Sequence, residues 1–157
     1  MRALRGINAA LEWCLRLLCG VLGAFITLLM FTQVIMRYFG DEPLSWSEEV
    51  IRYSFMWCGF LGAALAQRGG WHVALELVDS YPAPLRRLLR VLGPLVMIGF
   101  LALIAVSGWR LTALSWAVQS VALEWPMSFA YACIPASAVA MIAFSLEALL
   151  RGEAPAA

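Results

Sequence analysis

The sequence predicts an all-α integral membrane protein, with four transmembrane helices, short interfacial helices and both termini in the cytoplasm. Two observations predict this class. First, 63% of the 157 residues are hydrophobic and only 13% are charged, and a water-soluble domain of this length would expose too much of that apolar surface. Second, the chain contains apolar segments of about 20 residues, the length that a helix needs to cross the hydrocarbon core of a bilayer. Four crossings use most of the chain, so we expect one membrane domain over residues 1–157.

The first crossing is predicted over residues 14–37. Its uncharged run extends from Leu17 to Met36, and as a helix this run spans about 30 Å. The run is longer than the hydrophobic region of a signal peptide, and no clear small-residue cleavage site follows it. We therefore expect this helix to be retained.

The second crossing is predicted over residues 47–67. Residues from Gly40 to Pro43 break the first helix, and Ser45 followed by Glu48 has the spacing of a capping box. In a capping box the two side chains satisfy free backbone donors at a helix start. The second helix is therefore predicted to begin near Ser45.

Small residues line one face of this second crossing. Gly59 and Ala63 are four residues apart, and so are Gly62 and Ala66. Small side chains at this spacing let the backbone of another helix approach closely. We therefore predict that Gly59, Gly62 and Ala63 pack against a helix.

The third and fourth crossings are predicted over residues 88–110 and 125–147. The third is uncharged from Val91 to Trp109, and the fourth from Trp125 to Leu146. The mixed segment between them, residues 110–124, could extend the third helix or form a short surface helix. The sequence leaves these two alternatives open.

The arginines predict the orientation in the membrane. Cytoplasmic segments of membrane proteins carry an excess of basic residues. With the amino terminus inside, eight of the eleven arginines are cytoplasmic, which predicts that both termini lie there. These eight are Arg2, Arg5, Arg16, Arg68, Arg86, Arg87, Arg90 and Arg151.

Charge and cysteine usage argue against several classes of protein. The net charge of +1 does not provide the excess of basic residues that nucleic-acid binding requires. A membrane thiol oxidoreductase needs paired thiols, whereas the four cysteines are dispersed and are interpreted as small buried hydrophobic residues. With a single histidine and no cluster of His and Cys at metal-ligand spacing, we predict neither a metal site nor a cofactor. The cysteines are Cys14, Cys19, Cys58 and Cys133.

Polar residues gather at the start of the second crossing. Glu48 and Glu49 lie four and three residues before Arg52, so either carboxylate could pair with this arginine on one helix face. A proton relay, an acid/base pair of a membrane enzyme, a polar clamp against a partner and a simple helix cap are all compatible with the group. A relay requires a carboxylate deep in the membrane, and these two are at its rim. A clamp or a cap is therefore favoured, because Arg52 must find a partner or reach the surface.

A series of short motifs runs along the chain: Arg37-Tyr38, Trp46-Ser47-Glu48-Glu49 with Arg52, Gly62-Ala63-Ala64, Gly70 with His72-Val73, Leu75-Glu76 and Ile134-Pro135. Together these motifs resemble the small membrane subunit, the DctQ type, of the tripartite ATP-independent periplasmic (TRAP) transporters. The resemblance covers nearly the whole chain in length, segment number and order. The sequence departs from the family pattern at Glu76, where aspartate is frequent, and at Ala136 and Ser137, where a glycine is expected after the proline.

The resemblance implies a non-catalytic scaffold in a bacterial inner membrane. In such a system an extracytoplasmic binding protein delivers an organic acid to a large polytopic permease subunit, which would carry the substrate and sodium sites. The small subunit would pack beside the large one within the lipid. We predict no catalytic residue. The residues predicted to have structural or partner-facing roles are Arg37, Trp46, Glu48, Glu49, Arg52, Gly59, Gly62, Ala63 and His72.

One alternative from another class of protein stays open. A self-sufficient four-helix exporter or antiporter would have a similar composition and number of segments. It would transport substrate as a single chain, whereas the small subunit of a three-part importer would not.

Overall fold

The computed structural model describes residues 2–39, 45–68 and 82–151, and in this part of the chain the regular secondary structure is helical apart from one isolated β-bridge. The long helices are α1 (Arg2–Phe39), α2 (Ser45–Arg68), α4 (Ala83–Leu114) and α6 (Cys133–Arg151), and the short ones are the 3₁₀ helix η1 (Ser115–Ala117) and α5 (Ser128–Tyr131). The predicted start of the second helix at Ser45 is thus confirmed.

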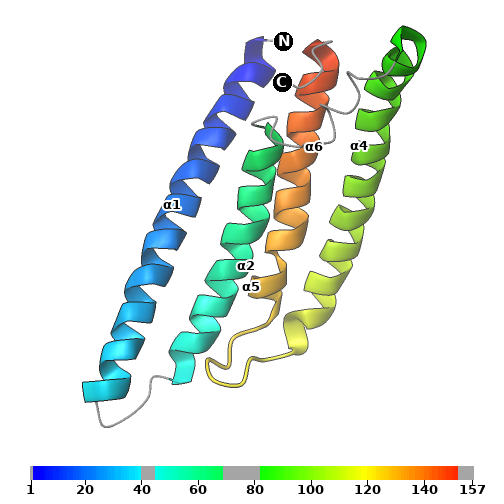
Figure 1. Cartoon of the computed structure of the whole chain (residues 1–157). Coiled ribbons are helices and arrows are strands. Elements are labelled where there is room, and N and C mark those ends of the chain that lie inside the picture. Colours follow the sequence, from blue (N-terminus) through cyan, green and yellow to red (C-terminus); the bar gives the residue numbers. More distant parts are fainter. Residues whose placement is uncertain (1, 40–44, 69–81, 152–157) are drawn as a thin grey trace.

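The four long helices run alternately up and down, side by side (Figure 1). The helices α2 and α6 occupy the middle of the arrangement, with α1 packed on α2 and α4 packed on α6. The start of α1 and the end of α6 therefore lie at the same end of the bundle (Figure 1).

Three candidate membrane spans follow from helix length and hydropathy: Gly6–Phe39, Leu95–Ala117 and Ser128–Glu147. They contain most of three predicted crossings. The predicted crossing over residues 47–67 lies in α2, which is not among the candidates. Charged residues at both ends of this helix, among them Glu48, Arg52 and Arg68, shorten its apolar part.

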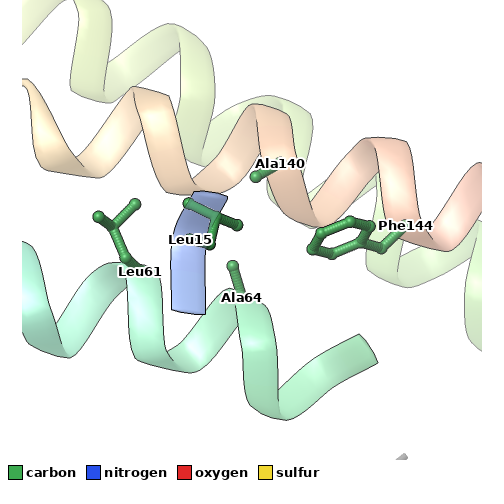
Figure 2. Close-up of a cluster of buried hydrophobic side chains, with 5 residues drawn as sticks. All are labelled: Leu15, Leu61, Ala64, Ala140 and Phe144. Carbon is green, nitrogen blue, oxygen red and sulfur yellow. The ribbon is translucent and has the colours of Figure 1, made fainter. Parts of the chain in front are cut away.

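The core is small and lies where α1, α2 and α6 meet. Leu15 of α1 packs there against Leu61 and Ala64 of α2 and against Ala140 and Phe144 of α6 (Figure 2). A much smaller share of the α1 span is buried than of the span that includes α6. The outer helix therefore presents most of its apolar side chains outward, as expected for a protein whose solvent is lipid.

The segment after the third predicted crossing consists of a helical part and a hairpin. The helix α4 continues to Leu114 and ends in η1, so an extension of the third helix is confirmed for the first part of the segment 110–124 only. Residues 118–127 then form a hairpin in which Gln119 and Pro126 make the antiparallel bridge. We call this segment the 118–127 hairpin. The last helical run starts only at Ser128, later than residue 125, because Trp125 and Pro126 belong to the hairpin.

The helices α4 and α6 are in close contact at Gly108. A Cβ atom placed on this glycine would lie 2.8 Å from Cγ2 of Ile134 and 3.1 Å from Cδ of Pro135. Such distances are too short for ordinary van der Waals contact, so the packing of these two helices requires a glycine at this position.

Candidate functional site

The predicted polar group at the start of α2 does not form the ion pair that its spacing suggested. Within residues 2–39, 45–68 and 82–151, the salt bridges all lie at the other end of the bundle, and none joins Arg52 to Glu48 or Glu49. The Arg52 side chain is exposed, and Glu48 lies 3.5 Å from the amide nitrogen of Gln33 on α1. Neither of the two possible pairs within α2 is formed in this structure, because both carboxylates interact with other segments.

Glu49 instead holds the 118–127 hairpin. One carboxylate oxygen accepts hydrogen bonds from the backbone N–H groups of Val121 and Ala122, and the other accepts one from Leu123, each at 3.1 Å. Three successive backbone donors converging on one carboxylate form an anion-binding nest. This carboxylate therefore links α2 to the connection between α4 and α6.

The other predicted residues at this end are mostly exposed. The side chains of Arg37, at the end of α1, and Trp46, in the first turn of α2, both face outward. His72 lies outside the described residues.

The small-residue face of α2 has no close partner among the described residues. Gly59 and Ala63 are exposed, and a Cβ atom added at Gly59 or Gly62 would meet nothing within 4 Å. The buried core residues of α2 are Leu61 and Ala64, with Trp57 and Leu65 packed against the same cluster. The expected contact with a helix is therefore absent from the described part of this chain, and a contact with another chain stays a prediction.

A group of ion pairs that the sequence analysis missed joins three helices at the end of the bundle where the chain begins and ends. Arg68, the last residue of α2, donates from Nε to Glu12 of α1 at 2.5 Å and from Nη1 to Glu147 of α6 at 2.8 Å. Its guanidinium also lies 4.8 Å from the ring centroid of Phe144, within the range of a cation–π interaction. We call Glu12, Arg68 and Glu147 the arginine clamp.

Polar side chains lie beside the arginine clamp, and one of them, Asn8, bonds directly to it. Asn8, which is 1% exposed, donates from Nδ2 to the Glu147 carboxylate at 2.6 Å and to the carbonyl oxygen of Ala143 at 3.2 Å. Gln67 donates to the hydroxyl of Ser145 at 2.6 Å. Since buried charges are stable only when they are paired and hydrogen-bonded, this network explains how Glu147 can be 5% exposed.

The network also acts on the protonation of Arg68. Burial by itself would lower the pKa of this guanidinium, but the hydrogen bonds and charges of Glu147 and Glu12 outweigh burial and raise the pKa above its ordinary value. Arg68 therefore stays positively charged.

A weak signal for the arginine clamp was present in the sequence. Glu12 precedes the first predicted crossing, Arg68 follows the second and Glu147 ends the fourth. In an alternating bundle these positions fall at one end, and their charges are opposite. The sequence could not show which of the charges at that end would pair.

Two of the cysteines are close together, which corrects their description as dispersed. The sulfur of Cys19 on α1 lies 4.0 Å from the carbonyl oxygen of Cys58 on α2, and the sulfur of Cys58 lies 3.9 Å from the carbonyl oxygen of Cys19. All four cysteines are free thiols. The reciprocal contacts fix the alignment of α1 and α2 midway along their interface.

The described residues contain no group of three or more His, Cys, Asp or Glu side chains that could hold a metal ion. The side chains of the arginine clamp and of Asn8, Gln67 and Glu49 contact other side chains or backbone groups. The chemistry that this arrangement supports is attachment of helices to one another.

Comparison with known proteins gives a consistent assignment. Residues 26–154 match the family model described as tripartite ATP-independent periplasmic transporters, DctQ component. The chain is 35% identical over 104 residues to a TRAP transporter small permease protein of Haemophilus influenzae, a match that covers 66% of this chain and 62% of the relative. It is 30% identical over 86 residues to the C4-dicarboxylate TRAP transporter small permease protein DctQ of Vibrio cholerae, covering 54% of this chain and 37% of the relative.

A third relative is much longer. The sialic acid TRAP transporter permease protein SiaT of Haemophilus influenzae is 33% identical over 82 residues, which are 52% of this chain but only 13% of the relative. The matches thus cover less than two thirds of the length of each of these three relatives.

Proposed function

The chain belongs to the DctQ component family of the TRAP transporters, and we propose that it scaffolds a large permease subunit during sodium-coupled, binding-protein-dependent import of an organic acid. The family assignment makes the chain a small component of a transporter in the inner membrane, not an enzyme. The scaffolding role, the ion and the substrate class are the proposal.

The observation that carries the scaffolding role is the arginine clamp. Its charged side chains lie between helices, where they pair with one another. A buried carboxylate that transports protons or ions must exchange partners during each cycle, whereas Glu147 is held by both Arg68 and Asn8. This arrangement favours a rigid part of a transporter over a moving one.

The long relative supports the proposed partner. The segment of SiaT that resembles this chain is 13% of that permease protein, so in SiaT it is covalently joined to the remaining 87%. A small subunit encoded as a separate chain would need a non-covalent interface to achieve the same association. The exposed Gly59, Gly62 and Ala63 face of α2 is a suitable surface, because small residues allow close helix approach.

The names of two relatives support the substrate class. One is named for C4-dicarboxylates and the other for sialic acid, and both of these compounds carry carboxylate groups. We propose an organic acid for this system on that basis, delivered by an extracytoplasmic binding protein as the family resemblance implies.

We also propose four crossings with both termini in the cytoplasm. The helix α2 lies between α1 and α6, which both contain candidate spans, so a membrane that encloses its neighbours would enclose α2 as well. The eight arginines predicted to be cytoplasmic lie in the first half of α1, at the end of α2, at the start of α4 and at the end of α6. The alternating helix directions bring these four regions to one end of the bundle, which agrees with the positive-inside rule.

Uptake measurements in cells test the proposal. Deleting this subunit while the large permease and the binding protein remain should abolish uptake of the organic acid, and supplying the intact chain should restore it. The purified chain alone in proteoliposomes should show no transport. Uptake that persists after the deletion would contradict the scaffolding role, and transport by the chain alone would favour the exporter.

A further inference from the structure

The 118–127 hairpin joins two candidate membrane spans, Leu95–Ala117 and Ser128–Glu147, at the end of the bundle opposite the arginine clamp. We propose that this hairpin lies in the headgroup layer of the bilayer, with its apolar side chains toward lipid, and anchors that end of the bundle.

The first argument is the hydrogen bonding of the hairpin backbone. The N–H of Ser120 donates to the carbonyl of Trp125, and the N–H of Met127 donates to the carbonyl of Val118, both at 2.9 Å. The N–H groups at the tip, residues 121–123, donate to the Glu49 carboxylate. Each of these donors therefore has an acceptor within the protein, as backbone donors near lipid require.

The second argument is the chemistry of the outward side chains. Val121, at the tip, is 93% exposed, and Val118 and Trp125 are also exposed. The rings of Trp116 and Trp125 flank that of Phe129, with centroid separations of 6.2 and 6.4 Å. Tryptophan is enriched where a membrane meets water, because its ring has both an apolar face and a polar N–H group.

The third argument is position. A ten-residue hairpin that stood upright would carry its tip roughly 17 Å from its base, about five residues of extended strand. The contacts with Glu49 exclude this arrangement, because Glu49 is in the second turn of α2. The hairpin lies beside the first turns of α2 (Figure 1). A second contact, from Nε1 of Trp57 to the carbonyl of Phe129 at 2.9 Å, holds α5, which directly follows the hairpin.

Lipid is the occupant that these observations favour over a protein. The exposed apolar side chains of the hairpin continue directly from exposed side chains of the adjoining span, such as Trp109 and Leu114. A span surface in contact with lipid would therefore adjoin the exposed apolar side chains of the hairpin.

Spin labelling tests the proposal. A label is attached at Val121→Cys in a full-length chain whose four cysteines are replaced by alanine, reconstituted in vesicles of phosphatidylethanolamine and phosphatidylglycerol. The label should collide more often with oxygen, which partitions into lipid, than with a water-soluble nickel chelate. A label at Leu103→Cys, exposed in the middle of a candidate span, gives the lipid reference. A label at position 121 that collides mainly with the nickel chelate, or that is shielded from both reagents by protein, would overturn the proposal.

A variant pair tests the role of Glu49. Glu49→Ala removes the acceptor for three backbone donors, so the label at position 121 should become more accessible to the nickel chelate. Glu48→Ala removes the neighbouring carboxylate, which does not contact the hairpin, and should leave the accessibility unchanged. Equal effects of the two substitutions would contradict the proposed role of Glu49.

A second measurement needs no cysteine replacement and covers the case in which the cysteine-free chain does not fold. Tryptophan fluorescence is measured for the unchanged chain and for Trp125→Phe in vesicles. It is quenched either by brominated lipids or by iodide in the water, and the difference between the two chains gives the share of each quenching that is due to Trp125. Trp125 should account for a larger share of the quenching by lipid than of the quenching by iodide, and the reverse result would reject the interfacial position.

Discussion

The guanidinium of Arg68 lies 2.8 Å from the carboxylate of Glu147, although the two residues are 79 positions apart in the chain. This contact joins the end of α2 to the end of α6, and the second contact of Arg68, with Glu12, adds α1. One side chain thus connects the three helices that form the core.

Arg68→Ala should destabilise the isolated subunit strongly. Removing one partner of a buried ion pair costs about 3–5 kcal/mol, and we expect a loss near the lower limit because the Arg68 side chain is 20% exposed. The measurement is the midpoint of unfolding in mixed micelles. Arg16→Ala is the matched control, since Arg16 contacts the same Glu12 but its side chain is 69% exposed. An exposed pair of this kind contributes about 0.3–0.5 kcal/mol, so equal losses in the two variants would refute the structural role of the clamp.

Gly108→Ala should separate α4 from α6. The new methyl group would lie 2.8 Å from Cγ2 of Ile134, and overpacking of this kind costs about 1–3 kcal/mol. Gly99→Ala on the same helix is the control, because a Cβ atom there would meet nothing within 4 Å. Thermal unfolding in detergent should show a lower midpoint only for the first variant.

A second substitution identifies the cause of the Gly108→Ala effect. Adding Ile134→Ala removes the clashing methyl group, so the double variant should lose less stability than the sum of the two single variants. Strict additivity of the losses would argue against a direct contact between these positions.

Gly62→Leu should leave the isolated subunit folded and weaken its association with the proposed large permease. The leucine would project from an open face of α2, where no atom of the described chain lies within 4 Å of an added Cβ. Co-purification of the tagged subunit from membranes measures the association, and thermal unfolding measures the fold. Full retention of the partner would indicate that this face contacts lipid.

Mild oxidation with copper phenanthroline should link Cys19 to Cys58. The sulfur of each lies within 4.0 Å of the other's carbonyl oxygen, which places the two side chains opposite each other between α1 and α2. Mass spectrometry of proteolytic fragments should detect this pair, and serine at positions 14 and 133 should not change the yield. Finding that links to Cys14 predominate would show that α1 and α2 are aligned differently.

The sequence alone predicted the class of fold and the course of the chain. Uncharged runs such as Leu17 to Met36 predict helices, because an apolar segment of that length can satisfy its backbone in lipid only as a helix. The start of α2 at Ser45 was also predictable, since a helix start depends on residues that are neighbours in the chain. The short motifs led to the correct family for the same reason, because a family pattern is a property of the sequence.

Only the tertiary structure decided which residues are partners. Glu49 has Arg52 three residues away but accepts hydrogen bonds from the backbone of residues 121–123, and Arg68 finds its partners on two other helices. Gly62 belongs to a small-residue pattern, yet a Cβ atom added there meets nothing in the described chain. Gly108 belongs to no such pattern, yet a Cβ atom added there would clash with Ile134. Such pairings depend on the rotation and depth of each helix relative to its neighbours. The rotation and depth are set by the packing of side chains that are distant in sequence. The helical repeat of one segment does not predict which of these side chains will meet.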